Sequence, residues 1–465
     1  MRTLRPGWFG FLLLGLALFS GCATCALAEG NPLNSLVWHK SQDRVDADIS
    51  SWDVRQLLEN VAAATGWKVY LDPDAAHKVS ARFKNLSNGD ALHSLLGDLN
   101  FVLVPQTNAA PRLYVFRTSQ QQATRLIAPA KKTVKPIPNQ LVVTLKPGSK
   151  TKIEDLARSL NAKIIGRMDG QNTYLLQFLD DLATQSAREQ LASNPDVAAV
   201  DVNFPFEPPT LLNASEAATP ELKLNPKTND GNCQLIVGLI DTPIQSLGGN
   251  LNTFIKPQIH VAGSVQVSSN QLTHATAMAT TILDALQAKT GGSTSVQIQP
   301  VDVYGNNETT STFDVANGIV QAVNNGANII NLSLGGTGDS QLLHDTITQV
   351  SQRGIPIYAA AGNDPVTTPT YPAAYPEVIS VTATDSTGKI ASYANRGSFI
   401  DMTAPGDNVV AFNGASYLVE GTSTSTAFVS GAAAGLADAS HVCADQAQAL
   451  LQKSLPRSSV LKTSQ

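Results

Sequence analysis

The sequence has few charged residues and no excess of positive charge. Only 15% of its 465 residues are charged, and 32 Lys and Arg against 37 Asp and Glu leave a net charge of −5. A nucleic-acid-binding protein normally presents a basic face, so this composition argues against that class. Apolar residues make up 43% of the chain, enough to build substantial cores. At ~150 residues per domain, the length suggests about three domains.

Cysteine is also scarce. The four cysteines are Cys22 and Cys25 near the N-terminus and Cys233 and Cys443 in the body of the chain. The latter two have no zinc-ligand spacing, and no metal-binding residues are assigned. In an exported protein an even pair forms a disulfide or remains as two buried thiols, and the sequence leaves both readings open.

A long hydrophobic run occurs at the N-terminus. Arg2 and Arg5 precede "GWFGFLLLGLALFSG", which is short for a membrane span, and "ALA" follows at Ala26–Ala28. A charged start, an apolar centre and a small-residue cleavage site predict a secretory signal peptide over residues 1–28. A retained anchor helix is one alternative. Another is acylation at Cys22, since "FSGC" resembles a bacterial lipobox, which would make the protein an outer-membrane lipoprotein.

Residues 34–117 have the pattern of a small α+β domain. "RVDADIS" alternates as a half-buried strand does, and "DVRQLLENVAAATG" has apolar residues at helical spacing before a glycine stop. Further strands and a second helix follow. The pattern resembles the short N-terminal domain of secretins and TonB-dependent receptors. That resemblance implies a periplasmic protein with an envelope protein partner.

A linker over residues 118–137 leads to a second small domain over residues 138–206. Its predicted elements follow the order β-α-β-β-α-β, which is a ferredoxin-like arrangement. Such a unit has no function of its own that its fold reveals. A second linker over residues 207–231 precedes the last and largest domain, over residues 232–465.

The third domain alternates apolar strands with helices, which predicts an α/β fold with a mostly parallel sheet covered on both faces. Asp241 and Asn363 each end a strand-like run, and His274 and Ser423 each precede a helix of small residues. Functional groups gather beyond the carboxyl ends of parallel strands. The order Asp, His, Asn, Ser matches the chain order of a subtilisin-type catalytic site.

The motifs around these residues resemble those of the subtilases, the subtilisin-like serine peptidases. "LIDTP" implies that Asp241 is the catalytic Asp, "HATAMA" that His274 is the base, and "GTSTSTAFVSG" that Ser423 is the nucleophile. "AAAGND" resembles the motif of the oxyanion donor, here Asn363. "INLSLGG" resembles the strand that pairs with substrate, through Ser333, Leu334 and Gly335.

The resemblance has further implications. The ferredoxin-like domain resembles the family's inhibitory propeptide, a folding aid and intramolecular inhibitor, with processing between Phe206 and Gln234; a retained accessory domain is the alternative. No cofactor is expected, and although calcium is common in the family, the sequence assigns no ligands for it. "HVAG" at His260–Gly263 superficially copies the His motif, but that alignment puts Pro257 at the catalytic position. His260, His344 and His441 are therefore expected to be structural.

Four residues depart from the family pattern, three where glycine is usual and the last where proline is usual. They are Pro243, Ala275, Thr280 and Ala427. An added side chain near a catalytic group can shift it, and a displacement near 1 Å can cost about 10²-fold in rate.

The prediction is an exported serine endopeptidase, periplasmic or secreted, acting on protein or peptide substrates through an acyl-enzyme intermediate. The alternatives are an inactive subtilase-fold binding protein and a self-processing envelope component. The cleavage specificity is not readable from the sequence.

Overall fold

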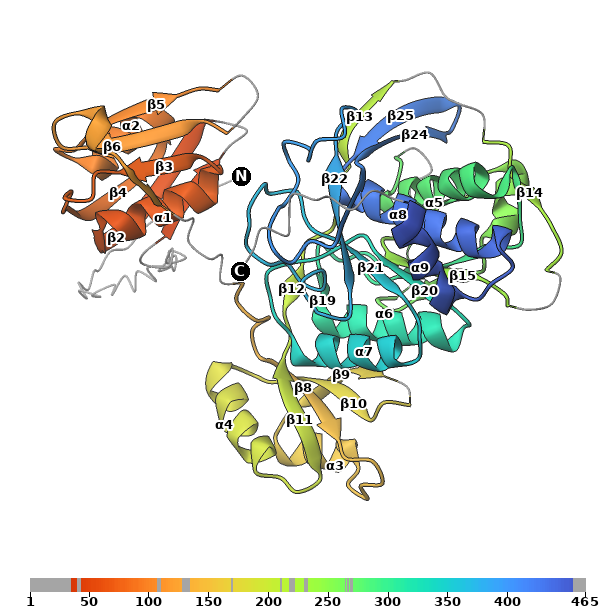
Figure 1. Cartoon of the computed structure of the whole chain (residues 1–465). Helices are drawn as coiled ribbons and strands as arrows, with labels where there is room; N and C mark the ends of the chain where they lie inside the picture. The colour runs from red at the N-terminus through yellow and green to blue at the C-terminus, as the bar shows by residue number, and fades with distance from the viewer. Residues whose placement is uncertain are drawn as a thin grey trace, which may run out of the picture. The chain divides into compact units, whose positions relative to one another are not determined.

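The computed structural model describes residues 35–39, 43–106, 110–127, 134–168, 170–209, 211–216, 222–229, 233–263, 265, 267 and 271–454. The expected signal peptide and Cys22 lie outside these residues. Contacts divide the chain into two units. The first comprises Met1–Thr65, Val69–Val102 and Leu113–Ala128, and the second comprises the rest (Figure 1). Each unit is described by itself below.

The N-terminal region contains two small sheets and two helices. One sheet has the strand order β1-β2-β4 and the other the order β5-β6-β3-β7. The elements are β1 (Ser35–His39), β2 (Arg44–Asp53), α1 (Val54–Thr65), β3 (Lys68–Leu71), β4 (Lys78–Ser87), α2 (Asn88–Leu96), β5 (Asn100–Val104), β6 (Arg112–Phe116), the short 3₁₀ turn η2 (Gln120–Gln122) and β7 (Arg125–Ile127). Helix α1 buries Leu57, Leu58 and Val61, the apolar positions that recur at helical spacing.

One strand of this region lies where the sequence suggested a linker. Strand β7 falls within residues 118–137 and pairs antiparallel with β3, with Val69 opposite Ile127. Ile127 is buried. A single buried apolar residue in a three-residue strand leaves too short a pattern to distinguish from linker sequence.

The second unit begins with the expected β-α-β-β-α-β domain. Its elements are β8 (Gln140–Leu145), α3 (Ile153–Ser159), β9 (Lys163–Met168), β10 (Thr173–Gln177), α4 (Asp181–Ala192) and β11 (Val197–Val202). The sheet has the order β11-β8-β10-β9 with antiparallel neighbours, which is the ferredoxin-like arrangement. Leu141, Val143 and Leu176 are fully buried beneath the two helices.

The rest of the second unit is built on a seven-stranded sheet of the order β16-β18-β15-β20-β21-β22-β23, in which every pair is parallel. Its strands are β15 (Ile236–Asp241), β16 (Ile259–His260), β18 (Gln297–Asp302), β20 (Ile329–Leu332), β21 (Ile357–Ala360), β22 (Ile379–Thr384) and β23 (Met402–Pro405). Strands β15, β20 and β21 are buried throughout, as continuous apolar runs covered on both faces are.

Helices cover the two faces of this sheet in pairs. Helices α5 (His274–Thr290) and α8 (Thr422–Ala439) share one core with α9 (Ala444–Ser454), and α6 (Thr312–Asn324) and α7 (Gln341–Gln352) share another. Figure 1 shows α6 and α7 side by side, apart from α5 and α8. The mostly parallel sheet with helices on both faces was expected from the sequence and is confirmed.

Small residues let α5 and α8 approach closely. A Cβ added at Gly431 of α8 would lie 2.5 Å from the carbonyl oxygen of Ile282 in α5. Ala275, Ala279 and Ala427 are fully buried in the same core. The alanine-rich runs that read as helices from the sequence are therefore a packed helix pair. None of the helices in the described part of the chain combines the length and apolar character that a membrane crossing needs.

Shorter strands complete the second unit. Strand β12 (Pro205–Phe206) pairs with β19 (Thr310–Ser311), and β14 (Asn225–Pro226) pairs with β17 (Ser293–Thr294). A separate antiparallel sheet has the order β13-β25-β24, formed by β13 (Leu212–Glu216), β24 (Asp407–Phe412) and β25 (Ala415–Glu420). A 3₁₀ turn, η3, covers Gly249–Phe254.

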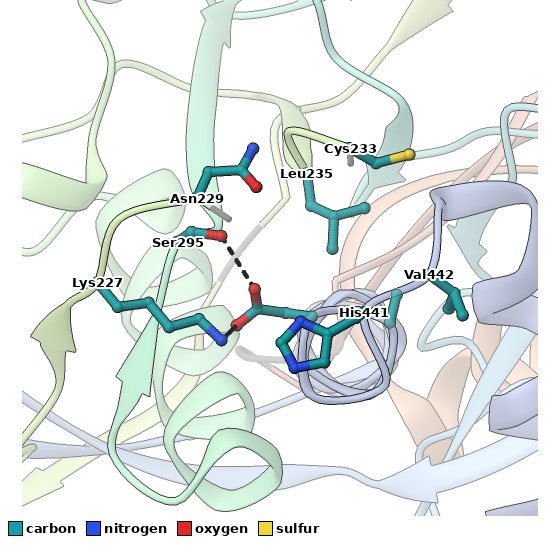
Figure 2. Close-up of a pocket in the computed structure, with 9 residues that line it drawn as sticks. Lys227, Asn229, Cys233, Leu235, Ser295, His441 and Val442 are labelled. Atoms are coloured by element: carbon teal, nitrogen blue, oxygen red, sulfur yellow. Dashed lines mark hydrogen bonds and ion pairs between the residues drawn. The ribbon is translucent and has the colours of Figure 1, made fainter. Parts of the chain in front are cut away.

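Cys233 and Cys443 form a disulfide, so the pairing that the sequence left open is present. It joins the start of the third domain to the residue before α9, across a sequence separation of 210. Nearby, the largely buried carboxylate of Asp438 contacts Lys227 Nζ at 3.1 Å and accepts hydrogen bonds from the hydroxyls of Thr294 and Ser295. Figure 2 shows Lys227 and Ser295 of this cluster. The Lys227 ammonium and the two hydroxyls together satisfy the buried charge of the Asp438 carboxylate. The cluster therefore has a structural role.

Candidate active site

The carboxyl end of β15 and the first residue of α5 form a buried Asp–His pair. Asp241 is the last residue of β15 and is fully buried, and His274 is 5% exposed. The Nδ1 atom of His274 lies 2.9 Å from each carboxylate oxygen of Asp241. Thr273 caps α5, its hydroxyl accepting from the amide of Thr276. The capped start of α5 therefore holds the His274 imidazole against the Asp241 carboxylate at the end of β15.

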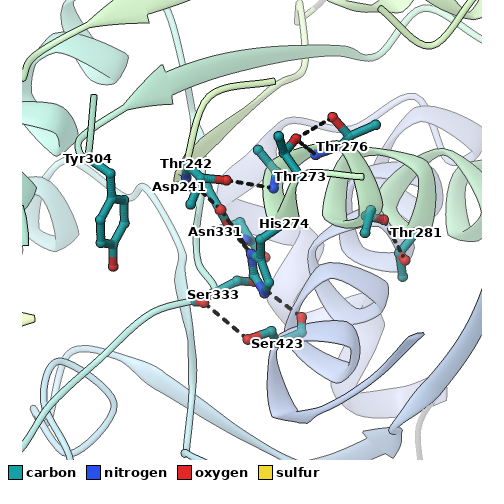
Figure 3. Close-up of polar contacts among 12 residues, drawn as sticks. Asp241, Thr242, Thr273, His274, Thr276, Thr281, Tyr304, Asn331, Ser333 and Ser423 are labelled. Carbon is teal, nitrogen blue, oxygen red and sulfur yellow. Dashed lines mark hydrogen bonds and ion pairs between the residues drawn. The ribbon is translucent and has the colours of Figure 1, made fainter. Parts of the chain in front are cut away.

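Ser423 lies at the start of α8, which begins at Thr422 after Gly421. Its side chain is nearly buried, and its Oγ donates to the carbonyl oxygen of Ser333 at 3.1 Å. The Ser333 hydroxyl donates in turn to the carbonyl oxygen of Ser423, also at 3.1 Å. Figure 3 shows the His274 ring between Asp241 and Ser423. The three residues that the motifs selected are therefore brought together.

Asn363 follows β21 and is held next to the start of α8. Its Oδ1 accepts from the amide and the hydroxyl of Thr422, at 2.9 and 3.0 Å. Because the oxygen is occupied in this way, the Nδ2 group is the donor end of the side chain. Gly421 is required here: its φ is 150°, and a Cβ would stand 3.3 Å from Asn363 Nδ2. The side-chain nitrogen Nδ2 of Asn363 thus lies at the N-terminus of α8, the helix that carries Ser423.

A buried polar chain supports Ser333 and was missed from the sequence. Asn331 is fully buried in β20, and its Nδ2 donates to the hydroxyl of Ser333 at 2.9 Å. Ser430 of α8 donates to Asn331 Oδ1, also at 2.9 Å. This chain ties β20 to α8 behind the nucleophile. The available signal was a lone polar residue within the apolar strand "IINL".

The residues expected to pair with substrate follow directly after β20. Ser333 and Leu334 are buried, and a Cβ at Gly335 would lie 2.9 Å from the carbonyl oxygen of Tyr371. The glycine therefore permits a close backbone approach at this edge.

The other hydroxyls beside Ser423 point into the protein. Ser425 donates to the carbonyl oxygens of Ala404 and Pro405, and Thr426 donates to the carbonyl oxygen of Thr422 within the helix. Thr424 is buried as well.

The three histidines that the sequence predicted to be structural have surroundings of their own. His260 contacts Asp302 at 3.3 Å, and His344 contacts Glu377 at 3.0 Å. His441 lines the cavity beside the disulfide. Among the described residues, no group of three or more His, Cys, Asp and Glu side chains is arranged to hold a metal ion.

The four departures from the family pattern are accommodated in the fold. Pro243, Ala275 and Ala427 are buried, and the Ala275 amide donates to the hydroxyl of Thr242 at 3.0 Å. Thr280 donates to the carbonyl oxygen of Thr276 within α5. The Asp–His contact keeps hydrogen-bond geometry with these residues in place.

The ferredoxin-like domain continues into a segment that pairs with two strands of the third domain. Strand β12 pairs with β19, and Phe206 is fully buried against Gly336, next to the expected substrate strand. Strand β13 pairs with β25, with Leu212 opposite Glu420. Glu420 ends the strand that leads through Gly421 to the nucleophile helix. Strand β12 thus lies beside Gly336, and β13 pairs with the strand that leads to Gly421.

Comparison with known proteins agrees with this arrangement. Residues 233–462 match the Subtilase family, and residues 122–203 match the Fervidolysin N-terminal prodomain. Subtilisin Savinase from Lederbergia lenta is 36% identical over a match that covers 38% of this chain and 60% of the relative. For Thermitase from Thermoactinomyces vulgaris the identity is 34%, covering 36% of this chain and 60% of the relative. These matches span less than two thirds of the relatives' length.

Solved structures show the same fold. Fervidolysin from Fervidobacterium pennivorans, described as a keratinolytic enzyme related to subtilisin, superposes with a TM-score of 0.51 at 17% identity, covering 66% of this chain and 55% of its own. The epidermin leader peptide processing serine protease of Staphylococcus aureus gives 0.50 at 16% identity, covering 68% and 91%. Residues 233–462 thus match the Subtilase family and have a subtilisin-like fold, and they follow a region that matches the fervidolysin prodomain.

Proposed function

We propose that the protein is a serine endopeptidase that hydrolyses peptide bonds in protein or peptide substrates. The observation that carries this proposal is the buried Asp241–His274 pair, which lies beside Ser423 at the start of α8. This is the arrangement by which a weakly nucleophilic hydroxyl is activated. The subtilase-family match over the same residues supports it.

The proposed reaction proceeds through an acyl-enzyme. The Ser423 hydroxyl turns from the Ser333 carbonyl to His274 Nε2, which takes its proton as Oγ attacks the substrate carbonyl. Asp241 accepts from Nδ1–H, which fixes the tautomer and stabilises the imidazolium. His274 returns the proton to the leaving amine, and a water molecule then hydrolyses the ester by the same steps.

Asn363 and the amide of Ser423 are the proposed donors to the oxyanion of the tetrahedral intermediate. Thr422 holds the asparagine by its oxygen, so Nδ2 is oriented before the substrate arrives. Preorganised donors of this kind need no rearrangement in the transition state. The N-terminus of α8 adds the positive end of the helix dipole at the same place.

The ferredoxin-like domain is the proposed intramolecular inhibitor and folding aid. Its side chains satisfy free amides at helix starts of the catalytic domain: Asn203 Oδ1 accepts from the amide of Phe313 in α6, and Asp201 Oδ2 accepts from the amide of Leu342 in α7. Phe206 occupies the side of the site next to Gly336. Processing is proposed between Glu207 and Leu212, in the segment that connects β12 to β13.

Export is the proposed route to the site of action. The N-terminal pattern of the sequence and an extracellular relative, the Minor extracellular protease Epr of Bacillus subtilis, support it. The periplasm and acylation at Cys22 are alternatives within this route. The first unit is proposed to contact an envelope protein; deleting residues 35–127 would then release the protein from the envelope fraction without loss of hydrolysis.

The test compares the leaderless chain with its Ser423→Ala variant. We expect the parent chain to shorten with time and to hydrolyse an unstructured protein such as casein, and the variant to do neither. Two identical, unprocessed and inactive chains would reject the proposal and favour an inactive binding protein. Self-cleavage without hydrolysis of casein would instead indicate a self-processing envelope component.

A further inference from the structure

The hydroxyl of Tyr304 is buried, and its hydrogen bond leads to the prodomain rather than to its own domain. Tyr304 is 2% exposed, and its hydroxyl donates to the carbonyl oxygen of Glu207 at 3.1 Å. Among the described residues no other partner of this hydroxyl is found. Glu207 directly follows β12, in which Phe206 is buried. A main-chain carbonyl of the inhibitory segment therefore satisfies a buried donor of the catalytic domain.

The turn that carries Tyr304 is held by the side chain of Asp302. Asp302 is fully buried at the end of β18, and its Oδ1 accepts from the amides of Tyr304 and Gly305, at 3.0 and 2.8 Å. Its Oδ2 lies 3.3 Å from Nδ1 of His260. The ring thus has little freedom to follow the prodomain when it leaves.

The surroundings of the hydroxyl favour its protonated form, which donates a hydrogen bond. Burial and the charge of Asp241 raise the pKa of Tyr304 well above its ordinary value. Departure of Glu207 removes the acceptor of this hydroxyl, and the carbonyl of an incoming peptide at the same place can replace it.

We propose that Tyr304 is a substrate-binding residue whose hydroxyl donates to a main-chain carbonyl of the peptide, on the amino-terminal side of the cut bond, at the place where it now holds Glu207. This inference rests on the proposed endopeptidase function. It assigns main-chain recognition, which tolerates many side chains, to a tyrosine that no motif identified.

The test compares two fluorogenic peptides with this chain's own sequence, one of residues 203–216 and one of residues 208–216. Both contain the bonds between Pro209 and Leu212, but only the longer one contains the Glu207 carbonyl. In processed enzyme, Tyr304→Phe is expected to raise KM about threefold to tenfold for the longer peptide, with kcat retained, and to leave the shorter peptide unchanged. The control is Tyr358→Phe, which removes a buried hydroxyl that has no partner among the described residues.

A third peptide makes the contact explicit. Replacing the Glu207 carbonyl with a thioamide, a weaker acceptor, should raise KM for the parent enzyme but not for Tyr304→Phe. An equal effect of Tyr304→Phe on both peptides would overturn the inference, because it would indicate a structural role. Hydrolysis of casein with neither peptide cut would overturn it as well. A parent chain that cuts nothing would instead reject the proposed function.

Discussion

The proposed role of Asn363 depends on its side-chain nitrogen being available as a donor. Its oxygen is held by Thr422, so truncation removes the donor proposed for the oxyanion. We predict that Asn363→Ala lowers kcat by about 10²–10³-fold and leaves KM nearly unchanged, because the donor acts on charge that develops in the transition state. Steady-state kinetics measure this effect. A decrease in kcat below about fivefold, with an unchanged melting temperature, would contradict the assignment.

Asp284 of α5 makes the stability of the folded protein depend on pH. Burial raises its pKa from 3.8 to about 6, although Asn408 donates a hydrogen bond to its carboxylate. Between these two values the folded state retains a proton that the unfolded state has lost, so this group's contribution to stability falls as the pH rises. Above about pH 6 the carboxylate is charged in both states and the loss is complete.

Asp284→Asn removes this loss. We expect only a small gain at pH 4, a gain that grows through pH 6, and a constant gain of about 3 kcal/mol at pH 8. Urea unfolding at the three pH values measures it, in a Ser423→Ala background that prevents self-digestion. A gain that is largest at pH 4 would show that the sign is wrong.

The sequence was most informative about residues whose role follows from their position on an element. Asp241 and Asn363 were identifiable because they end apolar strands, and Ser423 because it precedes a small-residue helix in the expected order. Asn331 and Tyr304 were not, because their partners, Ser430 and Glu207, are distant in the chain and meet them only in the fold.

At the scale of elements, most strands and helices followed the apolar periodicity. Elements that the sequence left unassigned include α7, although Leu343, Ile347 and Val350 form its buried side, and also the sheet strand β18 and helix α9; β7 was taken as linker. In each, few apolar residues carry the pattern. The attachment of the prodomain to α6 and α7 could not be predicted from the sequence. It depends on backbone amides at the two helix starts, which every residue type except proline carries.

Strand β12 supplies a prediction for that attachment. Phe206 is fully buried, and truncating a buried aromatic ring typically costs about 3–5 kcal/mol. In a Ser423→Ala background, Phe206→Ala should weaken prodomain binding and speed hydrogen exchange at the amides of Phe313 and Leu342, which Asn203 and Asp201 now satisfy. The matched control is Leu179→Ala, since Leu179 is 86% exposed. Equal exchange in both variants would contradict the proposed attachment.

For the second unit as a whole, the disulfide is the long-range covalent constraint. Closing a loop with a sequence separation of 210 restricts the unfolded chain, and the loop-entropy relation gives at most about 5 kcal/mol. We expect Cys233→Ser with Cys443→Ser to lower the unfolding midpoint of this unit, and reductant to lower it in the parent chain only. Calorimetry in a Ser423→Ala background measures both. A midpoint that is insensitive to both changes would show that other contacts fix this end of the chain.

The proposed activity of the whole site depends on Ser423 being a nucleophile that His274 activates. The most direct measurement is covalent labelling of processed enzyme with a fluorophosphonate, which reacts with activated serines, followed by peptide mass spectrometry. We expect one label on Ser423, and none when a His274→Ala variant of equal fold is treated. Labelling of another serine, or no labelling of a folded and processed chain, would contradict it.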